Sequence, residues 1–281
     1  MSTPLVTTAW LEEHLNDPNV RIVEVCQKKG EEATYHESHI PGAVGLFWKD
    51  LCWHDSDRQF VTPQEMAEKL GSIGVTPETT LVLYGDPVQY GTYAFWALTM
   101  SGHPNLNLLS GTRTLWAKEG RPMTAEVPKY SPASYSVEAT DGDSSMRLSR
   151  RKVLEKLGDS GRFLLDVRST EEYSGERVME YGNFDHGAER GGRIPGAKHL
   201  YFKELLNDDD TYKTPDEMRA KLASVGADPE KYNDLVVYCR LSHRATFVWF
   251  AMRYLLGYDN VRIYDGSWTE WGSIVGYPVE A

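Results

Sequence analysis

One segment of the sequence combines residue types that could carry nucleophilic chemistry on an anionic substrate. Residues 239–244 read Cys-Arg-Leu-Ser-His-Arg, so Cys239 is followed at once by Arg240 and, four residues later, by Arg244. A thiolate is a strong nucleophile, and neighbouring cations favour the thiolate over the neutral thiol. We therefore predict that Cys239 is the nucleophile and that Arg240 and Arg244 bind the substrate anion by charge-assisted hydrogen bonds.

The residues on either side of this loop predict a strand followed by a helix. Residues 235–238 form a short apolar run, and residues 245–257 carry apolar side chains at helical spacing before Gly257. Parallel sheets bind ligands at the carboxyl ends of their strands, and a tight loop before a helix turns its N–H groups inward. We expect the loop residues Leu241, Ser242 and His243 to stabilise a persulfide anion on Cys239.

The two halves of the sequence repeat one another. HIPGA at 39–43 matches RIPGA at 193–197, TPQEM at 62–66 matches TPDEM at 214–218, and residues 111–116 match 266–271. A period this long indicates a duplicated domain rather than a solenoid of short repeats. The second copy carries extra residues around 174–192.

Strands alternate with helices in each copy. Buried strands are predicted at 21–25, 80–84 and 163–167, in addition to 235–238. Thr62 and Thr214 each precede a proline and stand three residues before a glutamate, the pattern of a helix that begins with a capping box. This alternation predicts an α/β fold with a mainly parallel sheet and helices on both faces in each copy.

The expected organisation is two domains joined by a linker. We place an N-terminal domain at 1–120, a linker rich in Pro, Ser and Asp at 121–146, and a C-terminal domain at 147–281.

Charge and cysteine content limit the partners and the compartment. The net charge of −11 argues against nucleic acid or an anionic membrane as a partner. The polar start is not a signal peptide, and the longest apolar run is too short to span a bilayer. Three widely spaced cysteines form neither a disulfide framework nor a zinc pattern, so we expect a soluble protein in the reducing cytoplasm.

The loop at 239–244, the strand before it, the HIPGA and RIPGA turns and the ending DGSWTEWG resemble the tandem-domain thiosulfate sulfurtransferases of the rhodanese family. The resemblance covers nearly the whole chain and implies two rhodanese-like domains. It further implies that Cys239 takes the outer sulfur of thiosulfate and passes it to cyanide or a thiol acceptor, which could be a protein thiol. No cofactor or metal is implied. The N-terminal domain, where Tyr84-Gly85 replaces Tyr238-Cys239, would be catalytically silent.

The resemblance also gives a role to one further residue, and the loop differs from the family pattern at two positions. Arg190 matches an arginine that approaches the substrate anion, although pairing with a loop acid such as Glu189 is an equally good interpretation. Ser242 and His243 stand where many close relatives have a small and an acidic residue.

Three other functions remain as alternatives. A phosphatase would also use a Cys–Arg loop, but the phosphatases with a CX5R motif have five residues between the cysteine and the arginine, and Cys239 and Arg244 have four. A 3-mercaptopyruvate sulfurtransferase is disfavoured by the basic loop, since those relatives have an uncharged one. A persulfide carrier without turnover of small donors needs the same loop and is not distinguished by the sequence.

Several other polar residues are interpreted as structural. Cys26 and Cys52 are expected to be buried and inert. The pair His36 and His39 has the spacing of metal ligands, but no further ligand accompanies it. Asp166 is expected to accept hydrogen bonds that organise a loop.

Overall fold

The structure is a computed structural model, described here for residues 3–30, 34–137, 144–178 and 188–281. The chain divides into two compact units: the first comprises Met1–Ser144 and Asp208–Thr211, and the second comprises Ser145–Asn207 and Tyr212–Ala281. No helix in the described part of the chain is both long enough and apolar enough to cross a membrane.

The N-terminal unit alternates strands and helices over its described residues. In chain order these are β1 (Leu5–Val6), α1 (Thr8–Glu13), β2 (Val20–Cys26), the 3-10 turn η2 (Thr34–His36), β3 (Ala43–Phe47), α2 (Trp48–Cys52), α3 (Pro63–Ser72), β4 (Thr80–Tyr84), α4 (Gln89–Met100), β5 (Leu106–Leu109) and α5 (Arg113–Lys118). The strands form a five-stranded parallel sheet in the order β1-β5-β4-β2-β3.

The C-terminal unit repeats this arrangement. After the 3-10 turn η3 (Ser144–Met146), its described elements are β6 (Arg147–Leu148), α6 (Arg150–Glu155), β7 (Arg162–Asp166), α7 (Thr170–Ser174), β8 (Lys198–His199), the 3-10 turn η4 (Phe202–Leu205), α8 (Pro215–Ser224), β9 (Asp234–Tyr238), α9 (His243–Phe250), the π-helical turn η5 (Ala251–Leu255), β10 (Val261–Tyr264) and α10 (Ser267–Trp271). The parallel sheet has the order β6-β10-β9-β7-β8, which matches the first sheet strand for strand. The predicted domain duplication is confirmed.

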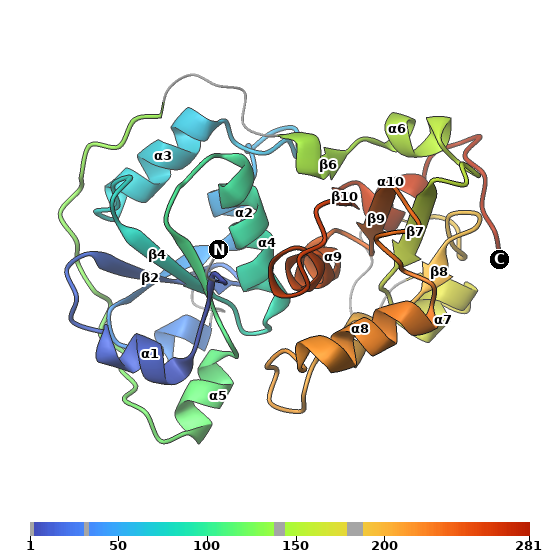
Figure 1. Cartoon of the computed structure of the whole chain (residues 1–281). Helices are drawn as coiled ribbons and strands as arrows, with labels where there is room; N and C mark the ends of the chain where they lie inside the picture. The colour runs from blue at the N-terminus through green and yellow to red at the C-terminus, as the bar shows by residue number, and fades with distance from the viewer. Residues whose placement is uncertain (1–2, 31–33, 138–143, 179–187) are drawn as a thin grey trace. The chain divides into compact units, whose positions relative to one another are not determined.

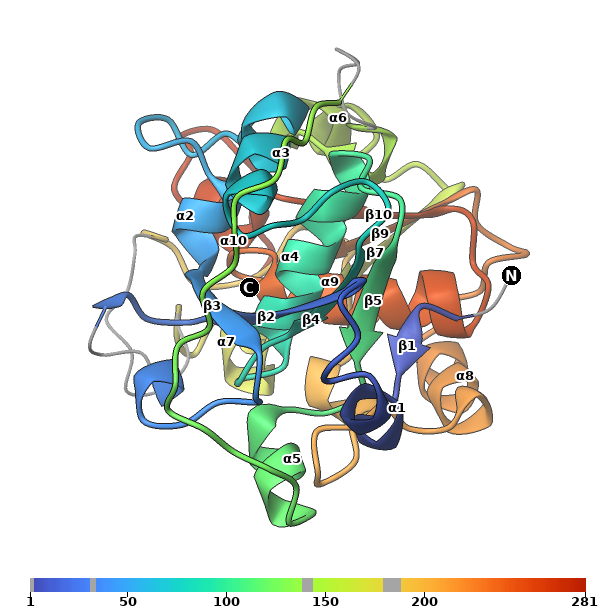
Figure 2. The ribbon, with the colours of Figure 1, turned by 90° about the vertical axis from the view of Figure 1, so that its left-hand side faces the viewer.

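Helices cover both faces of each sheet, as predicted. In the N-terminal unit, α2, α3 and α4 lie on one face and α1 and α5 on the other (Figure 2). In the C-terminal unit, α8 and α9 lie on one face and α6 and α10 on the other (Figure 1). The core under α6 and α10 includes Val153, Trp268 and Trp271, all fully buried.

The predicted strands are confirmed, with ends within one residue of those predicted. They could be predicted because their side chains are buried on both faces of the sheet. Every residue of β2, β7 and β9 is buried. Such strands appear in sequence as continuous apolar runs rather than as alternating patterns.

Both predicted capping boxes are present. The Thr62 hydroxyl accepts a hydrogen bond from the Glu65 N–H, and the Glu65 carboxylate accepts one from the Thr62 N–H. Thr214 and Glu217 make the same two contacts at the start of α8. These contacts satisfy donors that the first turn of a helix otherwise leaves unpaired.

Residues 121–137 of the predicted linker pack against the N-terminal unit. Thr124 forms a β-bridge with His39, and the Tyr130 ring lies 3.3 Å from the Arg21 guanidinium carbon. The Tyr135 hydroxyl is 2.7 Å from His103 Nδ1. This stretch is therefore part of the N-terminal unit rather than a separate linker. Residues 138–143 lie outside the described residues.

Candidate active site

Cys239 directly follows β9, at the carboxyl edge of the C-terminal sheet. Strand β9 lies between β7 and β10, and its last residue, Tyr238, is in register with Asp166 at the end of β7. Cys239 is 1% exposed. The strand therefore fixes the cysteine at the edge where parallel sheets bind their ligands.

The loop from Cys239 to Ser242 makes a sharp turn into helix α9. Ser242 has a left-handed backbone conformation, with φ of 70°, and the helix begins at His243 rather than at Ala245. Within the described part of the chain, the backbone N–H groups of Leu241 and Ser242 donate no hydrogen bond. Unpaired N–H groups in such a turn form a concave site for an anion.

The first residues of α10 hold the backbone of the cysteine in place. The Cys239 N–H donates to Ser267 Oγ at 3.3 Å, and the Cys239 carbonyl accepts from the Trp268 N–H at 2.9 Å. The Arg240 carbonyl accepts from the Thr269 N–H at 3.1 Å. Because its own N–H is used by Ser267, Cys239 contributes its side chain and not its backbone donor to the site.

Ser242 is held in place by buried groups between the end of β10 and the start of α10. Its hydroxyl donates to the Asp265 carbonyl at 2.5 Å and lies 3.3 Å from Ser267 Oγ. The Asp265 carboxylate is paired with Arg147 at 2.8 Å. Ser242, Ser267 and Asp265 are all buried, and these contacts hold a serine in the left-handed conformation that glycine usually adopts.

Arg244 does not point freely toward the cysteine loop. Its Nη1 and Nη2 donate to the two carboxylate oxygens of Glu172 at 2.6 and 2.8 Å. Glu172 lies in the first turn of α7 and is fully buried, while Arg244 is 7% exposed. Burial alone would raise the pKa of Glu172, but the hydrogen bonds and charge of Arg244 hold it below its ordinary value. The pair is therefore ionised, and Glu172 compensates the charge of Arg244.

Arg190 has partners other than the substrate anion that we predicted. Its guanidinium donates to the backbone carbonyls of Trp271, Gly272, Ile274 and Tyr277 at 2.8–3.0 Å. These carbonyls belong to the last residue of α10 and to the chain that follows it. These contacts connect Arg190 to the C-terminal segment, and no ion pair with Glu189 is seen among the described residues.

The remaining residues of the cysteine loop are Arg240, Leu241 and His243. Arg240 and Leu241 are partly exposed at the mouth of the loop. His243 is the first residue of α9 and is 9% exposed, and its carbonyl accepts a hydrogen bond from Thr246 Oγ1. Arg240 is thus the partly exposed cation of the loop.

A second buried ion pair lies at the end of β7. Asp166 accepts hydrogen bonds from the Arg168 N–H at 3.0 Å and from Arg168 Nη2 at 2.6 Å, which confirms its predicted structural role. Both side chains are fully buried, and the Arg168 guanidinium carbon lies 4.6 Å from the centre of the Trp268 ring. The burial and pairing of Arg168 were not predicted from the sequence.

The corresponding loop of the N-terminal unit has no room for a cysteine side chain. A Cβ atom on Gly85 would lie 2.5 Å from the Gly91 nitrogen. The next residue, Asp86, places a carboxylate oxygen 3.0 Å from the Thr114 nitrogen and 2.6 Å from its hydroxyl oxygen. The first turn of α5 therefore holds the Asp86 carboxylate at this loop.

The other cysteines lack the features of Cys239. Cys52 is fully buried, and burial raises its pKa well above the ordinary value. Burial, with a contribution from Glu24, raises the pKa of Cys26 to about 12. Both thiols are protonated at neutral pH, as expected for inert cysteines.

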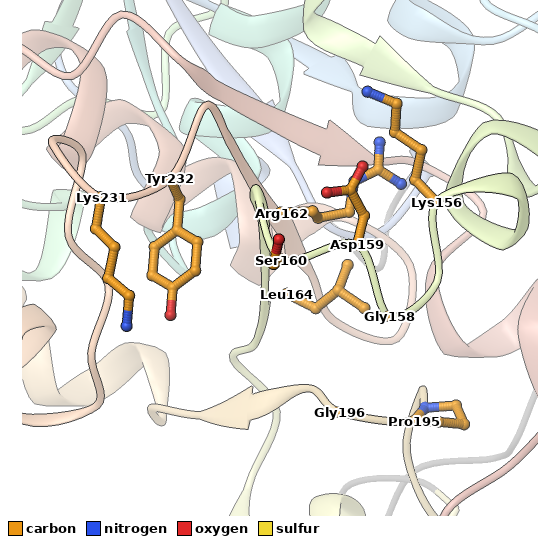
Figure 3. A pocket seen from close by; sticks show the side chains of 10 residues that line it. All are labelled: Lys156, Gly158, Asp159, Ser160, Arg162, Leu164, Pro195, Gly196, Lys231 and Tyr232. Atoms are coloured by element: carbon orange, nitrogen blue, oxygen red, sulfur yellow. The ribbon is translucent and has the colours of Figure 1, made fainter.

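Neither a metal nor the pocket of Figure 3 adds to the site. Among the described residues, no three His, Cys, Asp or Glu side chains are placed to hold a metal ion. The ring nitrogens of His39 contact the backbone carbonyls of Tyr35 and Glu126, consistent with a structural role. The pocket in Figure 3 is lined by Arg162 at the start of β7 and by Lys231 and Tyr232 before β9. It lies at the amino edge of the sheet, opposite Cys239.

Comparison with known proteins gives one consistent family. The model of the rhodanese-like domain matches residues 7–119 and 149–274. The "Sulfur carrier protein TtuD" of Thermus thermophilus is 42% identical over 98% of this chain and 95% of its own length. A "Putative thiosulfate sulfurtransferase" of Haloferax volcanii is 40% identical over 98% of this chain and 96% of its own.

Solved structures agree on the fold. The anaerobic ergothioneine biosynthesis enzyme of Chlorobium limicola superimposes with a TM-score of 0.83 over 99% of this chain and 70% of its own, at 23% identity. YnjE superimposes with a TM-score of 0.78 over 99% of this chain and 68% of its own, also at 23% identity. The chain belongs to the rhodanese family of sulfurtransferases and contains two rhodanese-like domains.

Proposed function

We propose that this protein transfers the outer sulfur of thiosulfate to a thiol or to cyanide through a persulfide on Cys239. The observation that carries the proposal is the position of Cys239 beside the unpaired N–H groups of Leu241 and Ser242. A terminal persulfide sulfur is an anion once sulfite has left, and these donors are placed to stabilise it.

The reaction has two displacement steps. The Cys239 thiolate attacks the outer sulfur of thiosulfate, a new S–S bond forms, and sulfite leaves with the electron pair of the broken S–S bond. An acceptor thiolate or cyanide then attacks the terminal sulfur of the persulfide, and Cys239 leaves as the thiolate. A covalent intermediate of this kind divides one difficult transfer into two easier ones and needs no cofactor.

The loop residues from Arg240 to His243, together with Ser267, have a proposed part in these steps. Arg240, partly exposed at the mouth of the loop, contacts the sulfonate oxygens of the donor. The backbone of Leu241, Ser242 and His243 surrounds the persulfide. Ser267 fixes the backbone of Cys239 and so directs the thiolate into the loop.

Steady-state turnover tests the donor. We expect the native chain to turn over thiosulfate with cyanide faster than it turns over 3-mercaptopyruvate, and Cys239→Ser to be inactive with both. Faster turnover of 3-mercaptopyruvate would identify the other donor as the substrate.

A sulfur carrier is the second candidate, favoured by the relative from Thermus thermophilus that bears this name. In a carrier, a partner protein would load Cys239 and a protein thiol would receive the sulfur. A chain that is persulfidated by a partner but shows no steady-state turnover with either small donor would support this candidate.

A further inference from the structure

The charge of Arg244 is compensated inside the C-terminal unit. Glu172 lies six residues after β7 ends, and Arg244 lies six residues after the neighbouring strand β9 ends. The two side chains therefore meet at the edge of the sheet that carries Cys239. Their contact is bidentate, at 2.6 and 2.8 Å, and both are buried.

The neighbouring charges do not change this balance. Arg168 also attracts Glu172, but Arg168 is itself paired with Asp166 at 2.6 Å. The four buried groups are two carboxylates and two guanidiniums, so their charges sum to zero. An anion in the cysteine loop therefore meets no net charge from this buried cluster.

We propose that Glu172 determines the specificity of the site for the charge of its sulfur donor. By compensating Arg244, Glu172 leaves Arg240 and the backbone donors of the loop to attract the donor anion. Arg244 positions the first turn of α9 and does not bind the sulfonate. This inference rests on the proposed function, since it concerns the donor of that same reaction.

The proposal predicts opposite effects for changing either partner. Glu172→Gln leaves one uncompensated positive charge beside the site, and Arg244→Gln leaves one negative charge. Even at the dielectric constant of water, a unit charge about 8 Å from a dianion changes its affinity by about fivefold. The KM for thiosulfate should therefore fall by about fivefold or more in Glu172→Gln and rise by a similar factor in Arg244→Gln.

The double variant Glu172→Gln/Arg244→Gln separates charge compensation from direct binding. It restores zero net charge without an arginine at position 244, so its KM should return to within about twofold of the native value. A KM as high as that of Arg244→Gln would overturn the proposal, because Arg244 itself would then contact the donor. Glu171→Gln is the matched control: the Glu171 side chain is 40% exposed to solvent on the same helix, so this change should leave KM unchanged.

The kinetic constants of Glu172→Gln distinguish charge compensation from a merely structural role of Glu172. A structural role would lower kcat or the folded fraction in Glu172→Gln and leave KM unchanged, and this result would also overturn the proposal. Near-ultraviolet circular dichroism of each variant reports the folded fraction to which kcat is referred.

A second measurement does not depend on thiosulfate. The rates at which iodoacetate and iodoacetamide alkylate Cys239 differ in their response to charge, because only iodoacetate is an anion. The ratio of the two rates should rise about twofold or more in Glu172→Gln and return to the native value in the double variant. An unchanged ratio in Glu172→Gln would overturn the proposal. Absent turnover of thiosulfate with a raised ratio would contradict the proposed donor and support the role of Glu172.

Discussion

Replacing Arg190 by lysine keeps the positive charge and removes most of the hydrogen bonds that this side chain makes. The guanidinium of Arg190 reaches four backbone carbonyls between Trp271 and Tyr277, at 2.8–3.0 Å. A lysine ammonium is a compact donor that can retain one or two of these contacts. At least two hydrogen bonds to buried or half-buried carbonyls are then lost.

The expected loss follows from the number of bonds broken. A hydrogen bond from a charged donor contributes about 1.5–3 kcal/mol, and Arg190 is only partly buried, so we take a lower value of about 1–2 kcal/mol for each. Arg190→Lys should therefore lower the free energy of unfolding by about 2–4 kcal/mol, measured by urea denaturation. The control Arg151→Lys changes an exposed arginine, 81% exposed, and should shift it by less than about 0.5 kcal/mol.

Activity distinguishes this role from substrate binding. If Arg190 only holds the C-terminal segment, kcat/KM for thiosulfate per folded molecule should remain within about twofold of the native value in Arg190→Lys. A large fall in kcat/KM with native stability would refute the structural role and support the contact with the substrate that the sequence suggested.

Two further predictions concern the ion pair and the N-terminal loop. The pKa of Glu172 in the folded protein is held below its ordinary value of 4.5. As the pH falls, the unfolded chain therefore takes up a proton at Glu172 before the native chain does. The stability that the ion pair contributes is present above about pH 4.5 and is lost below it. The difference in free energy of unfolding between the native chain and Glu172→Gln should therefore narrow as the pH falls below 4.5; a constant difference would show that Glu172 is not ionised. Gly85→Cys in a Cys239→Ser background should lower the melting temperature and give no sulfur transfer. The reason is that a Cβ atom at position 85 would lie 2.5 Å from the Gly91 nitrogen. Any turnover by this variant would contradict the conclusion that the N-terminal loop has no room for a cysteine.

The features that follow from local chemistry were predictable. Strands buried on both faces appear as apolar runs, and the threonines of the two capping boxes stand three residues from their glutamates. The position of Cys239 between a strand and a helix also follows from neighbouring residues. These features need no knowledge of which distant segments come together.

The features that depend on distant contacts were not predictable. Glu172 and Arg244 are 72 residues apart, and nothing near Arg244 indicates that its charge is compensated. Arg190 lies at the end of a stretch without a counterpart in the first copy, and its partners are backbone carbonyls that have no signature in sequence. Ser267, the first residue of α10, gives no sequence signal for its contact with Cys239, and its φ of 53° is a left-handed conformation that serine rarely adopts.

The helix after the cysteine loop was predicted only in part. Its existence was predicted, but it begins two residues earlier, because the left-handed Ser242 lets His243 enter the helix. It also ends in a π-helical turn, where the Leu256 N–H donates to the Ala251 carbonyl. The stop at Gly257 agrees with its φ of 78°.

The central claim is that Cys239 carries the transferred sulfur, and intact mass spectrometry tests it most directly. The native chain is measured before thiosulfate, after thiosulfate, and again after cyanide, beside Cys239→Ser as the matched control. We predict that the native chain gains the mass of one sulfur atom with thiosulfate and loses it with cyanide, while Cys239→Ser stays unchanged throughout. A native chain that gains no sulfur from thiosulfate, or a Cys239→Ser chain that does, would contradict the account.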